Sequence, residues 1–164
     1  MNKALVLIFD LDDTLYQKHG VVADDYSGIE NIKLYPGAKE LLAQLKTKFK
    51  LVLVTKGDAV IQNKKIDLLQ IRKQFNQILI CSLPEEKKTC FLSIKRKFSK
   101  YKYKYVVIGD KLGEEIRYGN ELKMITIRLQ KGKYGQESPQ KEYETPNYTV
   151  YNIPELKATL NAIK

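Results

Sequence analysis

An apolar strand that runs directly into a cluster of carboxylates is the feature that most restricts how this chain can fold. Residues 3–9 predict a strand, and Asp10, Asp12 and Asp13 follow it within four positions. A strand that is apolar along its length is typical of the centre of a parallel sheet covered on both faces. Carboxylates crowded at its end repel one another and lose hydration, unless a cation neutralises them. Because Mg²⁺ prefers oxygen ligands, the segment predicts a magnesium-binding active site.

Strands and helices alternate along the rest of the sequence. This order predicts one α/β domain, residues 1–164, with a doubly wound, Rossmann-like parallel sheet and helices on both faces. We find neither an internal repeat nor a linker that would divide it. The predicted strands are 3–9, 51–54, 75–80, 105–108, 124–129 and 148–150, and the predicted helices are 36–48, 58–70, 82–99, 113–122 and 154–163.

Polar residues follow three of these strands at the point where each strand ends. Asp10 and Asp12 follow the first strand, Thr55 follows the second, and Asp110 follows the strand at 105–108. In open parallel sheets, ligands bind beyond the carboxyl ends of the strands. We therefore expect these four side chains to meet in one crevice.

Composition limits the class of protein. A chain of 164 residues with 43% hydrophobic and 29% charged residues fits a globular domain. The apolar run Ala4–Phe9 is too short to cross a bilayer or to act as a signal peptide, which predicts a cytoplasmic protein without membrane contact. Cys81 and Cys90 lack metal-ligand spacing and are expected to be reduced packing residues. With His19 as the single histidine, any metal must be held by oxygen.

The net charge of +10 fits either a lysine-rich solvated surface or an anionic substrate or partner. Residues 87–104 contain eight Lys or Arg residues, and near the end of this basic segment Tyr101, Tyr103 and Tyr105 alternate with Lys102 and Lys104. Aromatic residues among basic ones can bind a nucleic-acid strand. However, this segment enters the amino end of the strand at 105–108, opposite the predicted site. We therefore expect nucleic-acid binding to be possible but disfavoured.

Three motifs in this order resemble those of the haloacid dehalogenase (HAD) superfamily. Asp10–Thr14 reads DLDDT and matches the family's DxDxT motif; Leu53–Thr55 matches its second motif, an apolar strand that ends in Thr or Ser. Gly109–Ile116 resembles its fourth motif, GDxxxxD, with Glu in place of the last Asp. The resemblance spans nearly the whole chain.

The resemblance implies phosphomonoester hydrolysis with Mg²⁺ as cofactor. Asp10 would be the nucleophile that forms an aspartyl-phosphate, and Asp12 the general acid and then the general base. Asp10, Asp110 and the main-chain carbonyl of Asp12 would hold the metal. Thr55, with Lys56 just after it, would bind the transferring phosphoryl group. Dehalogenases of this superfamily lack the second Asp, so the presence of Asp12 favours a phosphatase.

The third family motif is a lysine that precedes the fourth strand, and two neighbours are candidates. Lys87 lies on one helical stripe with Phe91, Ile94 and Phe98, whereas Lys88 is turned by about 100° from it. A lysine at the start of this inward stripe can reach the crevice and pair with phosphate. The pattern favours Lys87 over Lys88 for this role.

The resemblance gives three further residues supporting roles behind the metal and the nucleophile. Thr14 would hydrogen-bond near the turn that carries the nucleophile. Glu114 or Glu115 would order Asp110 or a metal-bound water, although a helix-start role for both is an equal alternative. Asp13 is given no chemical role.

Family members often carry a cap domain, inserted after the first or after the second motif. In this sequence neither position has room for such a domain. The intervals 17–35 and 56–86 are too short, which leaves 17–34 as a small flap or lid loop at most. An open site admits a phosphorylated small molecule, particularly if a homo-oligomer closes it, or a phosphate on a nucleic-acid end or a phosphoprotein. A third hypothesis is a HAD-fold binding or regulatory protein without turnover, although all the motif residues are present.

Overall fold

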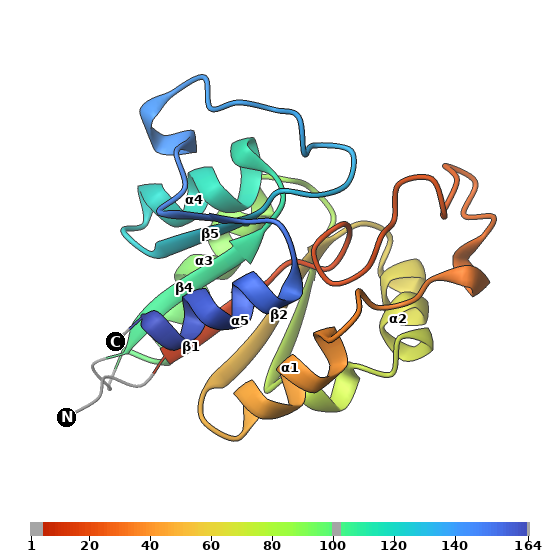
Figure 1. Ribbon diagram of the computed structural model, residues 1–164, viewed down its shortest axis with the longest axis horizontal. Helices are drawn as coiled ribbons and strands as arrows, with labels where there is room; N and C mark the ends of the chain where they lie inside the picture. Colours follow the sequence, from red (N-terminus) through yellow and green to blue (C-terminus); the bar gives the residue numbers. More distant parts are fainter. Residues whose placement is uncertain (1–4, 100–102, 164) are drawn as a thin grey trace.

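The computed structural model describes residues 5–99 and 103–163, and its centre is a six-stranded parallel sheet (Figure 1). The strand order is β3-β2-β1-β4-β5-β6. The predicted doubly wound topology is confirmed, because the chain runs outward from β1 in one direction and then in the other. The strands are β1 (Leu5–Phe9), β2 (Lys50–Lys56), β3 (Gln77–Cys81), β4 (Lys104–Gly109), β5 (Ile125–Leu129) and β6 (Tyr148–Val150).

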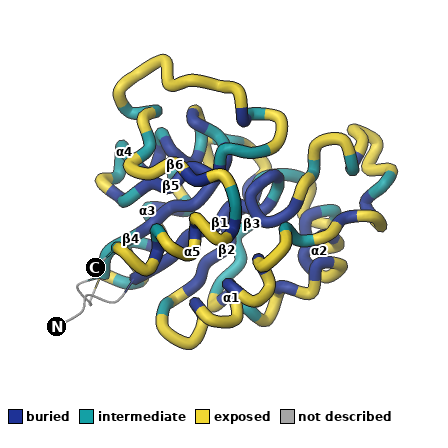
Figure 2. Tube along the Cα trace, in the orientation of Figure 1, coloured by how far each residue is buried: buried dark blue, intermediate teal, exposed yellow. Residues whose placement is uncertain are grey.

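Strand β1 lies in the middle of the sheet, and all five of its residues are buried, as its apolar sequence requires (Figure 2). The predicted start of this strand, residues 3 and 4, lies outside the described residues. Phe9 pairs in register with Leu53 of β2 and Ile108 of β4. Because the register is level, the residues that follow these strands emerge together at one edge of the sheet.

Five helices cover the two faces of the sheet, as predicted. The alternating residues of β1 divide the core, so that Leu5, Leu7 and Phe9 pack beside α1 and α5, while Val6 and Ile8 pack beside α3 and α4. Figure 1 shows α1 and α5 in front of the sheet. The helices are α1 (Ala38–Lys46), α2 (Ala59–Leu68), α3 (Glu86–Lys97), α4 (Arg117–Glu121) and α5 (Ile153–Ala162).

Local signals in the sequence account for where some helices begin. The side chain of Asp58 accepts a hydrogen bond from the amide of Ile61 and caps α2, as predicted. Helix α1 begins later than expected, because Gly37 has a φ of 82° and forms its N-cap, which leaves Pro36 outside the helix.

The helix predicted over 113–122 is divided. Its first part, Leu112–Ile116, is a π-helical turn, and α4 follows directly. A π-helical turn is wider than an α-helical turn and is frequent at functional sites. Its position directly after β4 brings Glu114 and Glu115 to the edge where the strands end.

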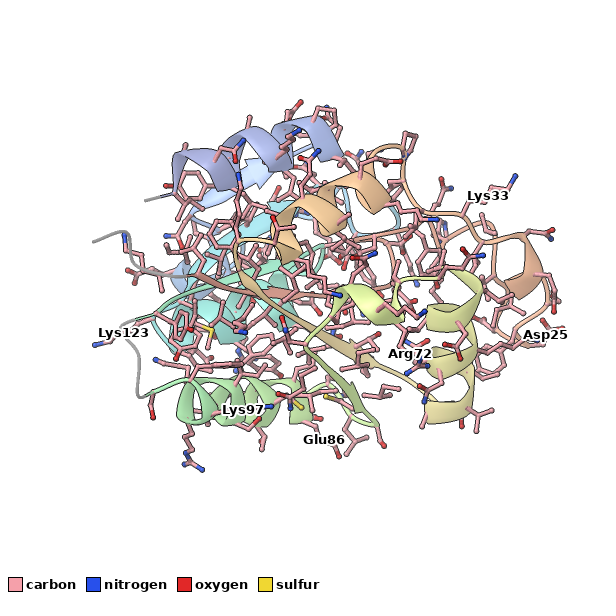
Figure 3. All side chains as sticks on the ribbon, turned by 90° about the horizontal axis from the view of Figure 1, so that it is seen from below. Asp25, Lys33, Arg72, Glu86, Lys97 and Lys123 are labelled. Atoms are coloured by element: carbon pink, nitrogen blue, oxygen red, sulfur yellow. The ribbon has the colours of Figure 1, made fainter. Side chains whose placement is uncertain are left out.

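Residues 17–34 form a projecting loop with one short 3₁₀ turn, Ile29–Asn31. Ile29 packs into the main core, whereas Asp25 and Lys33 point away from the domain (Figure 3). The described residues therefore hold no domain inserted here. No helix in the described part of the chain is long and apolar enough to span a membrane.

Candidate active site

A cavity of about 250 Å³ lies at the carboxyl ends of β1, β2 and β4. Residues predicted from the sequence form its floor: Asp10, Asp12, Thr55, Lys56, Lys87 and Asp110. The projecting 17–34 loop supplies Lys18, His19, Val22 and Asp24 to its wall, and the segment after β5 supplies Lys133 and Tyr134. The expectation that these strand ends share one crevice is confirmed.

Asp10 and Lys87 form a buried ion pair at the base of the cavity. The main-chain amide of Asp10 donates to the carbonyl of Ile108, and Lys87 Nζ lies 3.0 Å from Asp10 Oδ1. Burial raises the pKa of Asp10 to about 7, and Glu115 and Asp12 add to this rise while Lys87 opposes it. Burial alone would lower the pKa of Lys87, but the surrounding carboxylates raise it well above its ordinary value. Lys87 is therefore a fixed cation beside Asp10.

The carboxylate of Asp10 also belongs to a cluster with two further carboxylates. Asp10, Asp110 and Glu115 are all buried, and each offers an oxygen within 4.8 Å of the others. Both carboxylate oxygens of Asp110 are buried with no hydrogen-bond partner in the described residues. Burial, followed by the negative charges of Glu115 and Asp10, raises the pKa of Asp110 to about 9.

This cluster fits a divalent cation that prefers oxygen ligands. A cation would satisfy the two orphaned oxygens of Asp110 and offset the repulsion among the three carboxylates. The sequence interpretation gave Glu115 a supporting role or a place at a helix start, and the structure places it where it could also be a metal ligand. Its carboxylate lies in the cluster itself, because the wide turn after β4 carries it back over Gly109.

Glu114 points to a different set of partners. Its carboxylate lies 3.1 Å from the Nζ atoms of Lys56 and Lys111 and 3.2 Å from that of Lys87. Burial would raise the pKa of Glu114, but these three cations lower it to about 2. Glu114 therefore neutralises and orients the lysines along one side of the cavity, and it is neither part of the carboxylate cluster nor merely a residue at a helix start.

The carboxylate of Asp12 is held from behind by two buried residues that the sequence analysis did not assign. Lys65 Nζ lies 3.0 Å from Oδ1 and 3.1 Å from Oδ2 of Asp12, and the Tyr16 hydroxyl donates to Oδ1 at 2.6 Å. Lys18 approaches Oδ2 from the solvent side at 3.6 Å. A signal for Lys65 was present, since it lies four residues after Ile61 and four before Leu69, on the inward stripe of α2.

Thr55 is buried at the end of β2, and a third residue without a predicted role, Gln62, fixes its hydroxyl. Gln62 Nε2 donates to Thr55 Oγ1 at 2.6 Å and to the carbonyl of Lys56 at 3.0 Å. Because Thr55 Oγ1 accepts from Gln62, its own proton is free for an acceptor in the cavity. The arrangement suits an anionic oxygen.

Two expected site residues lie differently from the sequence interpretation. Lys88, the less favoured lysine, points out of the cavity and pairs with Glu121 at 2.6 Å, because it lies on another side of α3. Its assignment to phosphate binding is corrected. Thr14 is fully buried beside the nucleophile's turn, but its hydroxyl has no hydrogen-bond partner among the described residues.

Tyr103 and Tyr105 of the basic segment lie at the amino end of β4, opposite the edge of the sheet that forms this site. The ring of Tyr103 packs edge-on against Phe98 with centroids 5.9 Å apart, and the Tyr105 hydroxyl donates to the carbonyl of Lys95. Tyr101 lies outside the described residues. These contacts are those of packing residues at a helix end.

A doubly wound parallel sheet with an acidic cluster after its first strand defines a class of hydrolase, and comparison with known proteins identifies the family. Residues 22–120 match the model of the haloacid dehalogenase-like hydrolases. The chain belongs to this family, as its motifs predicted.

Curated relatives carry a more specific name. The chain is 30% identical over 140 residues to the glyceraldehyde 3-phosphate phosphatase of Methanopyrus kandleri, a match that covers 83% of this chain and 60% of the relative. It is 26% identical over 149 residues to the protein of the same name from Methanocaldococcus jannaschii, which covers 88% of this chain and 63% of that one. The chain thus spans about 60% of the length of these relatives.

Solved structures of the family share the fold. The HAD-hydrolase YfnB from Bacillus subtilis, solved with bound magnesium, matches with a TM-score of 0.76 at 17% identity, over 98% of this chain and 100% of that one. The 2-haloacid dehalogenase from Pseudomonas syringae matches with a TM-score of 0.74 at 14% identity, over 98% and 100%.

Proposed function

We propose that this domain, residues 1–164, hydrolyses phosphomonoesters with the help of Mg²⁺ and through an aspartyl-phosphate on Asp10. One observation carries the proposal: the buried Asp10 carboxylate pairs with a fixed cation, Lys87, and lies within 4.8 Å of an Asp110 carboxylate that has no hydrogen-bond partner in the described part of the chain. A nucleophilic carboxylate needs positive charge on both sides to approach a phosphate dianion.

In the first step, a carboxylate oxygen of Asp10 attacks phosphorus and the bond from phosphorus to the ester oxygen breaks. Asp12, held over the same cavity, gives a proton to the departing alcohol. In the second step, Asp12 takes a proton from water, and the water oxygen attacks phosphorus. Inorganic phosphate leaves, and the carboxylate of Asp10 is restored.

The surrounding residues hold the phosphoryl group in place. The Thr55 hydroxyl, oriented by Gln62, donates to one of its oxygens, and Lys87 and Lys56 supply positive charge. Asp10, Asp110, Glu115 and the main-chain carbonyl of Asp12 would hold Mg²⁺. When bound, the ion would neutralise charge on the phosphoryl oxygens in the transition state.

A phosphorylated small molecule is the substrate class that this cavity favours. Its volume of about 250 Å³ suits a compact phosphoester, and the 17–34 loop, as a small flap, supplies part of its wall. The name shared by the curated relatives makes glyceraldehyde 3-phosphate the first compound to test.

The test is phosphate release from a panel of phosphomonoesters, including glyceraldehyde 3-phosphate and p-nitrophenyl phosphate, with Mg²⁺ and with EDTA. We expect turnover that requires Mg²⁺ and that Asp10→Asn abolishes. Activity that persists in Asp10→Asn or in EDTA would overturn the mechanism. A 3′-phosphorylated oligonucleotide and a phosphopeptide belong in the panel, since preference for either would replace the small-molecule assignment. Turnover of none would favour a binding protein.

A further inference from the structure

Lys65 is a lysine buried in the core whose contacts converge on one carboxylate. It is 2% exposed, and its ammonium contacts both oxygens of Asp12, at 3.0 and 3.1 Å. In the same helix, Lys64 is half exposed and pairs with Glu30 on the surface at 3.4 Å. A lysine is rarely buried to this degree unless a specific partner requires it.

Tyr16, four residues after Asp12 in the sequence, is the second buried residue that contacts this carboxylate. Its side chain is fully buried, its hydroxyl lies 2.6 Å from Asp12 Oδ1, and Lys65 Nζ lies 6.0 Å from the centre of its ring. Oδ1 of Asp12 therefore accepts from both Tyr16 and Lys65, and Oδ2 accepts from the same Lys65 ammonium. These contacts fix the rotation of the carboxylate about its Cβ–Cγ bond.

We propose that Lys65 and Tyr16 are positioning residues that hold the Asp12 carboxylate in the orientation needed for proton transfer to the departing alcohol. Neither residue lines the cavity, and both act through the carboxylate of Asp12. The inference rests on the proposed function, and it deepens that function by assigning a role to a cation that none of the family motifs quoted above contains.

In the first step, the orientation of Asp12 matters only where the departing group needs a proton. An alkoxide is a poor leaving group and requires the proton, whereas p-nitrophenolate leaves without one. Loss of alignment therefore slows the hydrolysis of an alkyl phosphate more than that of p-nitrophenyl phosphate. General acid catalysis contributes about 10²- to 10⁴-fold, and misplacement by about 1 Å costs about 100-fold.

The test compares kcat/KM of Lys65→Met on glycerol 3-phosphate and on p-nitrophenyl phosphate, because kcat/KM reports the steps up to release of the alcohol. We expect a loss of about 10- to 100-fold on the alkyl ester and a much smaller loss on the nitrophenyl ester. Tyr16→Phe, which removes only the hydroxyl, should show the same pattern to a smaller degree. Lys65→Arg, which keeps the charge, should recover part of the alkyl-ester activity.

Lys64→Met is the matched control, since it removes a lysine from the exposed side of the same helix. It should leave both substrates unaffected. Equal losses on the two esters in Lys65→Met and Tyr16→Phe, or no loss in either, would overturn the inference. If Lys65→Met does not fold, the pattern in Tyr16→Phe and Lys65→Arg decides. If the unaltered protein releases phosphate from no compound of the phosphomonoester panel, the proposed function itself has failed.

Discussion

Lys87 Nζ lies 3.0 Å from Oδ1 of Asp10, and the two side chains come from α3 and from the end of β1, far apart in the sequence. Both are buried, and the same ammonium also contacts the carboxylates of Glu114 and Glu115. One lysine thus pairs with the proposed nucleophile and with two acids of the fourth motif. Its removal should affect both chemistry and folding.

Lys87→Met should lower kcat about 10²- to 10³-fold, the usual effect of removing one group that stabilises transition-state charge. It should also lower the free energy of unfolding by about 3–5 kcal/mol, because the buried carboxylates of Asp10 and Glu115 lose their cation. Steady-state kinetics and urea unfolding measure these effects. Lys88→Met is the control on the same helix and should change stability by no more than about 0.5 kcal/mol. Equal effects of the two substitutions would contradict the assignment of Lys87.

The second prediction concerns pH. In the metal-free protein the pKa of Asp110 is about 9, above its ordinary value of 3.8 in an unfolded chain. Between these values the folded state binds the extra proton, so metal-free stability falls as pH rises from about 4 through 9. The slope is at most about 1.4 kcal/mol per pH unit for this group. Urea unfolding of the metal-free protein at pH 6 and pH 8 should show the loss.

Mg²⁺ should reverse this dependence, because it binds the ionised carboxylates and competes with their protons. Thermal unfolding should therefore show a larger Mg²⁺-induced rise in Tm at pH 8 than at pH 6. Asp110→Asn should remove most of the rise and should make the metal-free protein less sensitive to pH. A rise in Tm that is the same at both pH values would argue against metal binding by Asp110.

Residues at strand ends were predictable because the parallel sheet itself brings them together. Asp10, Thr55 and Asp110 each follow an apolar strand, and once the strands are parallel their ends must share one edge. Lys87 was predictable from helical periodicity, since it continues an inward apolar stripe.

The rest of the site depends on side-chain packing that leaves little trace in the sequence. Gln62 resembles a solvated polar residue of any surface helix, and it is buried because Thr55 and the carbonyl of Lys56 accept its amide. Spacing places Lys65 on the inward stripe of α2, but it does not reveal Asp12 as its partner. Glu115 stands at the last position of the fourth motif, but it reaches the carboxylate cluster through a π-helical turn that no periodicity predicts.

A third prediction concerns the contact between Gly109 and Glu115. A Cβ atom at Gly109 would lie 2.5 Å from Glu115 Cγ, so Gly109→Ala must displace the glutamate. We expect weaker Mg²⁺ binding and a loss of about 1–3 kcal/mol in stability from overpacking. Gly113→Ala, in the same segment, has nothing within 4 Å of the added carbon and serves as the control. Calorimetric titration with Mg²⁺ measures the affinity of both variants. Unchanged affinity in Gly109→Ala would exclude Glu115 as a ligand.

The last prediction concerns Asp13, to which we assign a structural role. Its Oδ1 accepts the main-chain amides of Lys18 and His19, which fixes the start of the 17–34 loop against the cavity. Its φ is 55°, a left-handed conformation that Asp and Asn tolerate better than most residues. Asp13→Ala should therefore loosen the loop, through two lost hydrogen bonds and backbone strain.

Limited proteolysis should cut Asp13→Ala within 17–34 faster than the unaltered protein, and the free energy of unfolding should fall by about 1–3 kcal/mol. Asp13→Asn is the matched control, because it keeps an oxygen acceptor and tolerates the same backbone. It should retain most of the protection and most of the activity. If Asp13→Asn were instead as inactive as Asp10→Asn while the loop stayed protected, Asp13 would have a charge-dependent role in the chemistry.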